Sequence, residues 1–417
     1  MLHELPDYLR KKHTMLIGLW VAKQEPDMTI FLQPFVNQAN KLSEYGFKWN
    51  NKGKEIMSKL FPITCCVDSP ARCAMLNMKR FNGIHGCTYC EYPTVKIDNV
   101  RKYPMIENIP KLRTDESVKR QMAFAYYKYC SSTQSKQVDV LGVWGPSALM
   151  NLKHFNIVSG MIVDFLHACL VGLTELHTNI IFSNVAEEYY VGDPTKTHLI
   201  NQRLLSIKPP TCVGKTPRGI TERNNWKASE WLTWLLYYSI PCLSGLTKKK
   251  YIIHLSLFVR AMNILLSDSI TPKMLHTANE LPITFVFQFG QLYGNNYMHY
   301  NVHRLLHLRE SVKNWGPLWA ISTFPFENEN KLVLRMKKNN SVVDDIFIIK
   351  MEWIMDYNED YSMEEINDLI EDYETFEAGY NSHIENLLKP NGMEHFYQAL
   401  HLKIIDIYTE KTDNIPN

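Results

Sequence analysis

Short apolar runs near the start of the chain alternate with one amphipathic segment. Residues 14–22 and 61–67 are compact runs of apolar, β-branched and thiol side chains, which are typical of buried strands. Between them, the chain after Pro26 and Asp27 carries apolar residues at helical spacing as far as Gly46. The pattern predicts strand, helix and strand in that order, an arrangement found in folds that mix helices with sheets.

Asp68 directly follows the second predicted strand. Ser69 and Pro70 then indicate a helix start, a capping residue followed by proline at the first helical position. Asp68 is therefore expected at the carboxyl end of a strand, where α/β sheets place their functional groups. The basic residues that come next on this predicted helix are Arg72, Lys79 and Arg80. They are expected on the solvent-exposed surface, where they would also suit contacts with nucleic-acid phosphates.

The remaining pattern predicts a helical middle and a return to strands. Residues 91–139 are polar and loop-like, so they are expected to serve as a connector. From 141 to 310 helical periods dominate, and 316–337 is strand-like and turn-like again. We therefore predict an α/β (α+β) chain with an N-terminal part of the core at 1–95, a mostly helical insertion at 96–310, a return to the core at 311–343 and an acidic helical tail at 344–417.

Two groups inside the helical stretch have ordinary structural interpretations. Trp226, Trp231 and Trp234 lie near helical spacing and are expected in the core. Asp164 and His167 lie one helical turn apart and are expected to form a buried hydrogen-bonded pair rather than a catalytic one.

The net charge of +2 conceals two oppositely charged parts. Residues 1–343 contain 41 Lys and Arg against 25 Asp and Glu, a net of +16, whereas 344–417 contain 4 against 18, a net of −14. A basic body suits a polyanion such as nucleic acid, although basic residues also cover proteins that have no such partner. Charge alone leaves both interpretations open.

The nine cysteines indicate a reducing compartment. Their number is odd, they lie between Cys65 and Cys242, and no apolar leader precedes them, so free thiols or metal ligands are expected. The longest apolar run, 231–246, is interrupted by Pro241 and is shorter than the ~20 residues that span a bilayer. We expect a protein that is neither secreted nor inserted in a membrane.

Cys87 and Cys90 form a Cys-x-x-Cys motif, which supplies half of a zinc site. Two glycines just upstream allow the tight turn that directs both sulfurs at one ion. His303 and His307 are candidates for the other two ligands, because residues four apart on a helix share one face. His299 competes on that face, and the alternative is unmetallated thiols with surface histidines.

Asp68 and Glu327 are the carboxylates considered for a second kind of metal site. Hard oxygen ligands of this type hold Mg²⁺ in two-metal phosphoryl-transfer sites, which also require a third acid. In the alternative interpretation, Asp68 caps its helix and Glu327 is a solvated carboxylate in a turn.

Five motifs, taken in order along the chain, resemble those of an animal transposase of the CACTA/EnSpm type. They are 67–72 (Val-Asp-Ser-Pro-Ala-Arg), 81–90 (Phe-Asn-Gly-Ile-His-Gly-Cys-Thr-Tyr-Cys), 226–230 (Trp-Lys-Ala-Ser-Glu), 301–308 (Asn-Val-His-Arg-Leu-Leu-His-Leu) and 315–327, which runs from Trp-Gly-Pro-Leu-Trp to Phe-Pro-Phe-Glu. The resemblance covers residues 5–335.

The resemblance implies an RNase H-like core interrupted by a helical insertion, with a DDE triad of acids acting through two Mg²⁺ or Mn²⁺ ions. It assigns the second acid to Asp68 and the last to Glu327. DNA as a partner and a nuclear location follow from the same resemblance, with the cytoplasm as the alternative location. The resemblance also implies a structural Zn²⁺ ion, with ligands that map onto Cys87, Cys90, His303 and His307.

The first acid of such a triad lies upstream of the 5–10 motif (Leu-Pro-Asp-Tyr-Leu-Arg), and this chain begins at that motif. Asp7 falls in a proline-containing loop, so we do not accept it as a replacement. The resemblance therefore predicts an N-terminally truncated, domesticated transposase remnant with defective catalysis, a retained zinc site and DNA binding, alone or as a homodimer, and no small-molecule substrate. The alternative is a zinc-stabilised protein-interaction scaffold with no role on nucleic acid.

Overall fold

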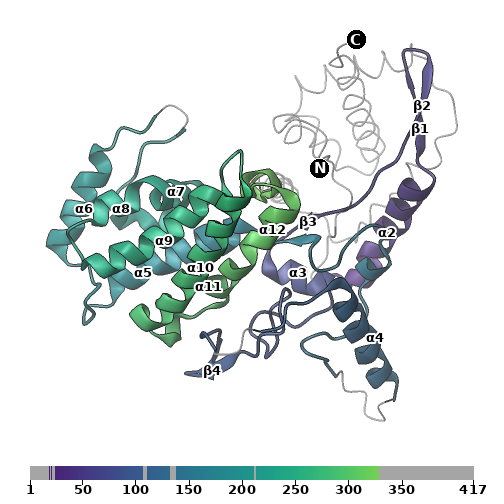
Figure 1. The fold of residues 1–417 in the computed structure, drawn as a ribbon, viewed down its shortest axis with the longest axis horizontal. Helices are drawn as coiled ribbons and strands as arrows, with labels where there is room; N and C mark the ends of the chain where they lie inside the picture. The colour runs from purple at the N-terminus through teal and green to yellow at the C-terminus, as the bar shows by residue number, and fades with distance from the viewer. Residues whose placement is uncertain are drawn as a thin grey trace. The chain divides into compact units, whose positions relative to one another are not determined.

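The computed structural model describes residues 18, 20, 24–106, 110–131, 138–210 and 213–327 (Figure 1). The chain divides into two compact units. Residues 63–150 and 155–324 belong to the larger unit, and the smaller unit contains 151–154 together with the described residues before 63 and after 324.

The described residues of the smaller unit include one long helix and one hairpin. Helix α2 (Met28–Glu44) begins after Asp27, whose carboxylate accepts hydrogen bonds from two backbone N–H groups of the first turn. The helix ends before Gly46, as its apolar spacing predicted. Strands β1 (Phe47–Asn51) and β2 (Lys54–Ser58) follow as an antiparallel hairpin.

A two-stranded parallel sheet lies in the larger unit. Strand β3 (Cys65–Cys66) pairs with β6 (Met161–Ile162), with Cys65 opposite Met161 and Cys66 opposite Ile162. Only two residues of the strand predicted at 61–67 are therefore part of a sheet.

Helix α3 (Ser69–Met75) starts soon after β3, but its N-cap is Asp68 and not Ser69 as predicted. The Asp68 carboxylate accepts a hydrogen bond from the Ala71 N–H at 2.8 Å. Ser69 is already the first helical residue, so the residue before it supplies the cap. The alternative in which Asp68 caps its helix is confirmed.

The segment 91–139, predicted to be a connector, contains regular structure. Strands β4 (Val95–Ile97) and β5 (Val100–Lys102) form an antiparallel hairpin, and α4 (Asp115–Ser131) is a helix of 17 residues. The residues of α4 that are buried are Val118, Met122 and Ala125. The prediction of a loop was wrong because this narrow apolar stripe is outnumbered by polar and tyrosine side chains.

Helices dominate the rest of the larger unit, as predicted for 141–310, and the three tryptophans expected in the core are buried. Helices α9 and α10 pack side by side (Figure 1). The α-helices are α5 (Glu175–Ser183), α6 (Pro194–Ser206), α7 (Ala228–Thr233), α8 (Ser239–Leu243), α9 (Lys249–Leu265), α10 (Pro272–Tyr293), α11 (Tyr300–Arg304) and α12 (Leu308–Trp315). The 3-10 and π-helical segments are η1 (Ala148–Asn151), η2 (Leu166–Thr174), η3 (Ile220–Asn225), η4 (Trp234–Tyr238), η5 (Asn295–Tyr297), η6 (Leu305–His307) and η7 (Leu318–Ile321).

Residues 316–327 do not form the strand-like structure predicted for them. Gly316 ends α12 with a φ of +87°, a conformation that favours glycine. The chain then forms the 3-10 turn η7 and is helical again over 324–327. The acidic tail at 344–417 lies outside the described residues, as does the strand predicted at 14–22 except for positions 18 and 20, which are not in a strand.

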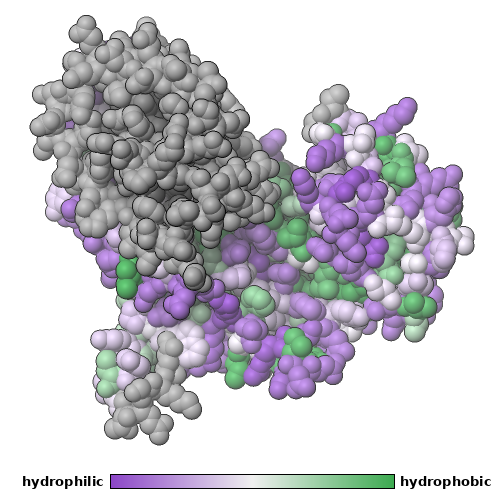
Figure 2. Space-filling view, turned by 180° about the vertical axis from the view of Figure 1, so that it is seen from behind, coloured by the Kyte–Doolittle hydropathy of each residue, from purple (hydrophilic) through white to green (hydrophobic). Residues whose placement is uncertain are grey.

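The described residues thus combine many helices with three two-stranded sheets, which confirms a mixed helix-and-sheet class. The RNase H-like core is a narrower claim and remains a prediction. None of the described helices is both long and apolar enough to cross a membrane. Figure 2 shows hydrophilic residues over much of one face of the described part, with hydrophobic residues in scattered groups.

Candidate metal centre

Two buried cysteines lie on a tight loop that requires glycine. Cys87 and Cys90 are 0% and 2% exposed. A side chain at Gly86 would place its Cβ 2.4 Å from the carbonyl oxygen of Arg80, closer than non-bonded atoms approach. The chain therefore folds back on itself just before the first thiol, as predicted for a metal-binding knuckle.

The two histidines come from the end of the helical stretch. His303 lies in α11 and His307 is the last residue of η6, and both are buried. His299 does not belong to the group, because it precedes α11 and its Nε2 lies 3.0 Å from Nζ of Lys102.

The four side chains converge on one point. Sγ of Cys87 lies 3.5 Å from Nε2 of His307, Sγ of Cys90 lies 3.3 Å from Nε2 of His303, and the two Nε2 atoms are 3.3 Å apart. All four ligand atoms lie within 4.8 Å of one another. A tetrahedral zinc ion, with bonds of ~2.3 Å to sulfur and ~2.05 Å to nitrogen, would separate S from N by about 3.5 Å and N from N by about 3.3 Å. The observed spacing matches such an ion.

The acid-base properties of the group also suit a metal. Burial acts to raise the pKa of Cys87, but the hydrogen bond from Cys90 and the two imidazoles outweigh it and hold this pKa well below its usual value. The pKa of Cys90 is raised, first by that hydrogen bond and then by burial. Burial lowers the pKa of His303, which favours the neutral imidazole that binds metals. A divalent cation would displace the remaining thiol proton.

Aromatic rings surround the imidazoles. The ring centroid of Tyr89 lies 5.1 Å from that of His307, and those of Tyr92 and Tyr103 lie 4.9 and 4.8 Å from that of His303. Rings packed at these distances limit imidazole rotation and exclude water from the ligands.

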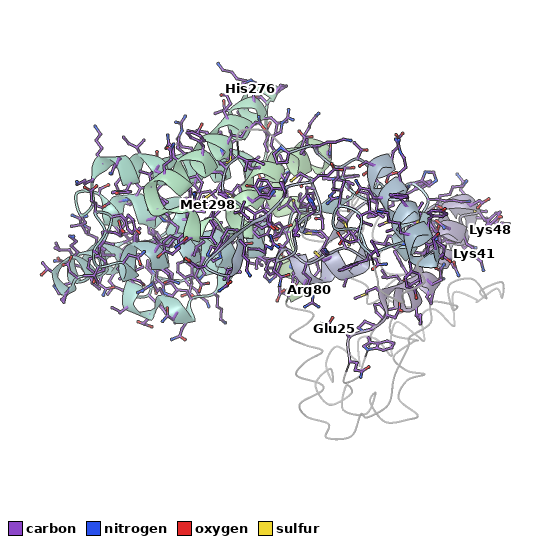
Figure 3. All side chains as sticks on the ribbon, turned by 90° about the horizontal axis from the view of Figure 1, so that it is seen from below. Glu25, Lys41, Lys48, Arg80, His276 and Met298 are labelled. Carbon is purple, nitrogen blue, oxygen red and sulfur yellow. The ribbon has the colours of Figure 1, made fainter. Side chains whose placement is uncertain are left out.

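A backbone hydrogen bond ties the β4–β5 hairpin to the histidine segment. The N–H of Tyr103, just after β5, donates to the carbonyl oxygen of Met298 at 2.7 Å. Met298 is fully buried within the helical part (Figure 3). The backbone of Tyr103 is therefore anchored, which fixes the position of its ring next to His303.

Arg113 organises the backbone of the cysteine loop. Its buried Nε donates to the carbonyl oxygens of Cys87 at 3.0 Å and Cys90 at 3.2 Å, and Nη2 donates to that of Leu141 at 2.6 Å. Nη1 donates to the side chain of Gln121 at 2.7 Å. Sequence reasoning missed Arg113, because no local pattern distinguishes it from a surface arginine.

Two aspartates lie just beyond the paired strands, Asp68 after β3 and Asp164 after β6. We call this end of the sheet the acid edge. The strands pair in parallel, so their carboxyl ends meet at the same edge. Asp164 is fully buried and accepts hydrogen bonds from Oγ1 of Thr323 at 2.7 Å and, in a very short contact, from Nδ1 of His167. The predicted hydrogen bond between Asp164 and His167 is confirmed, but only Asp164 is buried, since the His167 side chain is 32% exposed. The position of Asp164 beside β3 was missed.

The predicted catalytic carboxylates fall in different units. Asp68 belongs to the larger unit, where it is half-buried and caps α3. Glu327 belongs to the smaller unit. The expectation that Asp68 and Glu327 share Mg²⁺ or Mn²⁺ ions remains a prediction.

The three basic residues predicted on the surface differ in exposure. Arg72 was predicted wrongly: it is 0% exposed, because its guanidinium donates to carbonyl oxygens at the ends of β3 and β6. Lys79 forms an ion pair with Asp139 at 2.6 Å. Arg80 is exposed at the edge of the ribbon (Figure 3), and both residues lie beyond the end of α3.

No protein-family model matches this chain, and no curated protein matches it in sequence. The resemblance to transposases therefore rests on the ordered motifs alone, whereas the Cys/His group rests on its geometry.

Proposed function

We propose that the chain is derived from a DDE-type transposase and keeps a structural zinc ion. The ion joins the cysteine loop (86–90) to the histidine helix (300–307, which comprises α11 and η6). The ligands are Cys87, Cys90, His303 and His307. The observation that carries the proposal is the convergence of these four buried ligand atoms at tetrahedral spacing. Two sulfurs and two nitrogens are a ligand set typical of zinc, and four protein ligands leave no open position for a substrate.

Metal analysis of the purified protein tests the zinc site directly. We expect one zinc per chain, lost in Cys87→Ser and in His303→Ala. His299→Ala is the matched control and should keep its zinc, because that imidazole faces Lys102 rather than the cysteines. Full zinc occupancy in both ligand variants would refute the assignment.

The proposed partner of the basic body is DNA. A net charge of +16 over residues 1–343 supports this partner. The affinity for DNA should fall steeply as the salt concentration rises. In a plot of the logarithm of the association constant against the logarithm of the salt concentration, each neutralised phosphate should contribute about −0.9 to the slope. Arg80→Glu should weaken binding more than Arg120→Glu, which makes the same charge change on α4. A lack of binding even at low ionic strength would remove DNA from the proposal.

Strand transfer is proposed to be defective. The purified chain, incubated with terminal-repeat DNA and Mg²⁺ or Mn²⁺, should give no nicking. Robust cleavage that Asp68→Ala abolishes would show that the acid site is active, and would confirm Asp68 as one of its ligands.

One observation favours the alternative of an interaction scaffold. Helix α4 exposes four aromatic side chains, with exposed fractions of 49% for Phe124, 56% for Tyr126, 66% for Tyr127 and 49% for Tyr129. Exposed aromatics at this density are typical of binding surfaces. Pull-down with and without nuclease separates the two functions, since partners bridged by DNA are lost on nuclease treatment and direct protein partners remain.

A further inference from the structure

Two arginines are buried beside the acid edge. Arg72 of α3 is 0% exposed and Arg304 of α11 is 1% exposed. Each guanidinium lies over a tyrosine ring, Arg72 at 5.0 Å from the centroid of Tyr89 and Arg304 at 5.5 Å from that of Tyr300. Within the described part of the chain, neither arginine is within ion-pair distance of a carboxylate. The direct contacts of these buried cations are therefore hydrogen bonds and aromatic faces, and the Asp164 carboxylate adds a longer-range attraction to Arg304.

The backbone of the acid edge accepts the hydrogen bonds of both arginines. Nη2 of Arg72 donates to the carbonyl oxygen of Val67 at 3.0 Å, in the residue after β3, and to that of Ile162 at 2.9 Å, in the last residue of β6. Nη2 of Arg304 donates to the carbonyl oxygen of Asp164 at 3.2 Å. These contacts hold the residue before Asp68, the end of β6 and Asp164 itself.

Both arginines are also connected to the metal-ligand group. Tyr89, beneath Arg72, lies between the two cysteines in sequence and packs against the ring of His307. Arg304 is the residue after His303 in α11. The cysteine loop thus contacts the acid edge through Tyr89 and Arg72, and the histidine helix contacts it through Arg304.

Several polar atoms of these arginines lack protein partners, which argues against a purely stabilising role. Nε and Nη1 of Arg72 and Nε of Arg304 have no hydrogen-bond partner among the described residues. Replacing such a buried charged group by a well-packed apolar side chain is often neutral or stabilising. A guanidinium does what an apolar chain cannot, since the single Nη2 group of Arg72 donates to two carbonyl oxygens, one just after β3 and one in β6.

We propose that Arg72 and Arg304 are positioning residues that couple occupancy of the Cys/His metal site to the conformation of the acid edge. When the ion is bound, it fixes the rings of Tyr89 and His307 and the end of α11, where Arg304 lies. The two arginines then hold the ends of β3 and β6 in register. Without the ion, this end of the sheet loosens. The inference rests on the proposed zinc site and is independent of DNA binding.

Hydrogen exchange measured by mass spectrometry on the full chain tests this coupling. In the zinc-loaded Arg304→Lys variant, amides of residues 160–168 should exchange about tenfold faster or more, because a charged hydrogen bond to the edge is lost. Zinc content should remain one per chain. Arg309→Lys on α12 is the matched control and should leave the edge unchanged. Zinc removal from the wild-type protein should produce the same local increase.

The outcomes separate the inference from the proposed function. Helix α9 serves as the internal reference in the zinc-removal experiment. If its amides also lose protection, the protein has unfolded globally. In that case the zinc-loaded Arg304→Lys variant alone decides. Wild-type protection at 160–168 in that variant, with zinc bound, would overturn the inference and leave the zinc site intact. Absence of bound metal in the wild-type protein would overturn the zinc site and the coupling together.

Discussion

The Cys/His group and the acid edge are built in opposite ways. In the Cys/His group, four buried side chains from segments 213 and 220 residues apart meet with one another. At the acid edge, each carboxylate has a structural partner close to it in sequence: Asp68 caps α3, and Asp164 is bound by His167. Asp164 is also bound by Thr323, which lies 159 residues further along the chain. Converging thiols and imidazoles therefore point to an ion, whereas carboxylates that already have partners close in sequence fit a structural role as well as a catalytic one.

The largest effect should come from opening the metal site. Cys90→Ser should lower the free energy of unfolding by more than about 5 kcal/mol, since structural zinc contributes ~10–16 kcal/mol in small zinc-finger peptides. Calorimetry should then show the melting temperature falling by more than about 10 °C. Cys130→Ser changes an exposed thiol and is the control. Equal melting temperatures for the two variants would show that the site is not structural.

Arg113 should rank second, because it supports the cysteine loop without being a ligand. Arg113→Met leaves the carbonyl oxygens of Cys87, Cys90 and Leu141 without this donor and should cost about 3 kcal/mol in chemical denaturation. Arg120→Met breaks an exposed ion pair on α4 and should change stability by less than about 0.5 kcal/mol. A similar effect of both substitutions would mean that the loop does not depend on Arg113.

Asp164 should make a smaller, pH-dependent contribution. Burial acts to raise its pKa, but hydrogen bonds from His167 and Thr323 and the charge of Arg304 outweigh it and lower the pKa below its usual value. A lowered pKa in the folded state stabilises the protein above the unfolded-state pKa of ~3.9, and this stabilisation is lost as the pH falls through the folded-state value.

Urea unfolding of the wild-type protein and of Asp164→Asn between pH 7 and pH 3 measures this contribution. The difference in unfolding free energy should be about 1–3 kcal/mol at pH 7 and should shrink toward the acid end. Loss of zinc at low pH affects both proteins, so the difference isolates the carboxylate. A difference that stays constant with pH would contradict the lowered pKa.

Asp68 should give the smallest effect. Asp68→Ala removes the cap of α3 and should cost about 1 kcal/mol, whereas Asp68→Ser keeps a capping oxygen and should be close to neutral. Chemical denaturation of both variants decides. A large loss of unfolding free energy in the serine variant would show that the carboxylate does more than cap the helix. The acid edge would then resemble the Cys/His group in having a role beyond local structure.

Much of the fold could be predicted from local pattern, and the errors have physical causes. The helical spacing of apolar residues between Pro26 and Gly46 predicted α2. Helix α4 was missed because its buried stripe is narrow, and β3 was predicted too long because pairing, not composition, sets the length of a strand.

The site could be predicted only where residue chemistry is restrictive. Few roles suit a Cys-x-x-Cys and a histidine pair, so their meeting was predictable over a long separation. Arginines have many roles and are usually exposed, so the burial of Arg72, Arg113 and Arg304 could not be predicted without the carbonyl oxygens that the fold brings to them. The parallel pairing of β3 with β6 could not be predicted from the local sequence either.

The long separation between the two halves of the Cys/His group has a consequence during protein synthesis. The sulfurs of Cys87 and Cys90 are translated 213 to 220 residues before the imidazoles that complete the group. At ~5–20 residues per second, a ribosome needs roughly 10 to 45 s to cover that interval. For this time the nascent chain carries the two thiols without His303 and His307. Completion of the Cys/His group is therefore a late event that follows synthesis of the whole helical stretch.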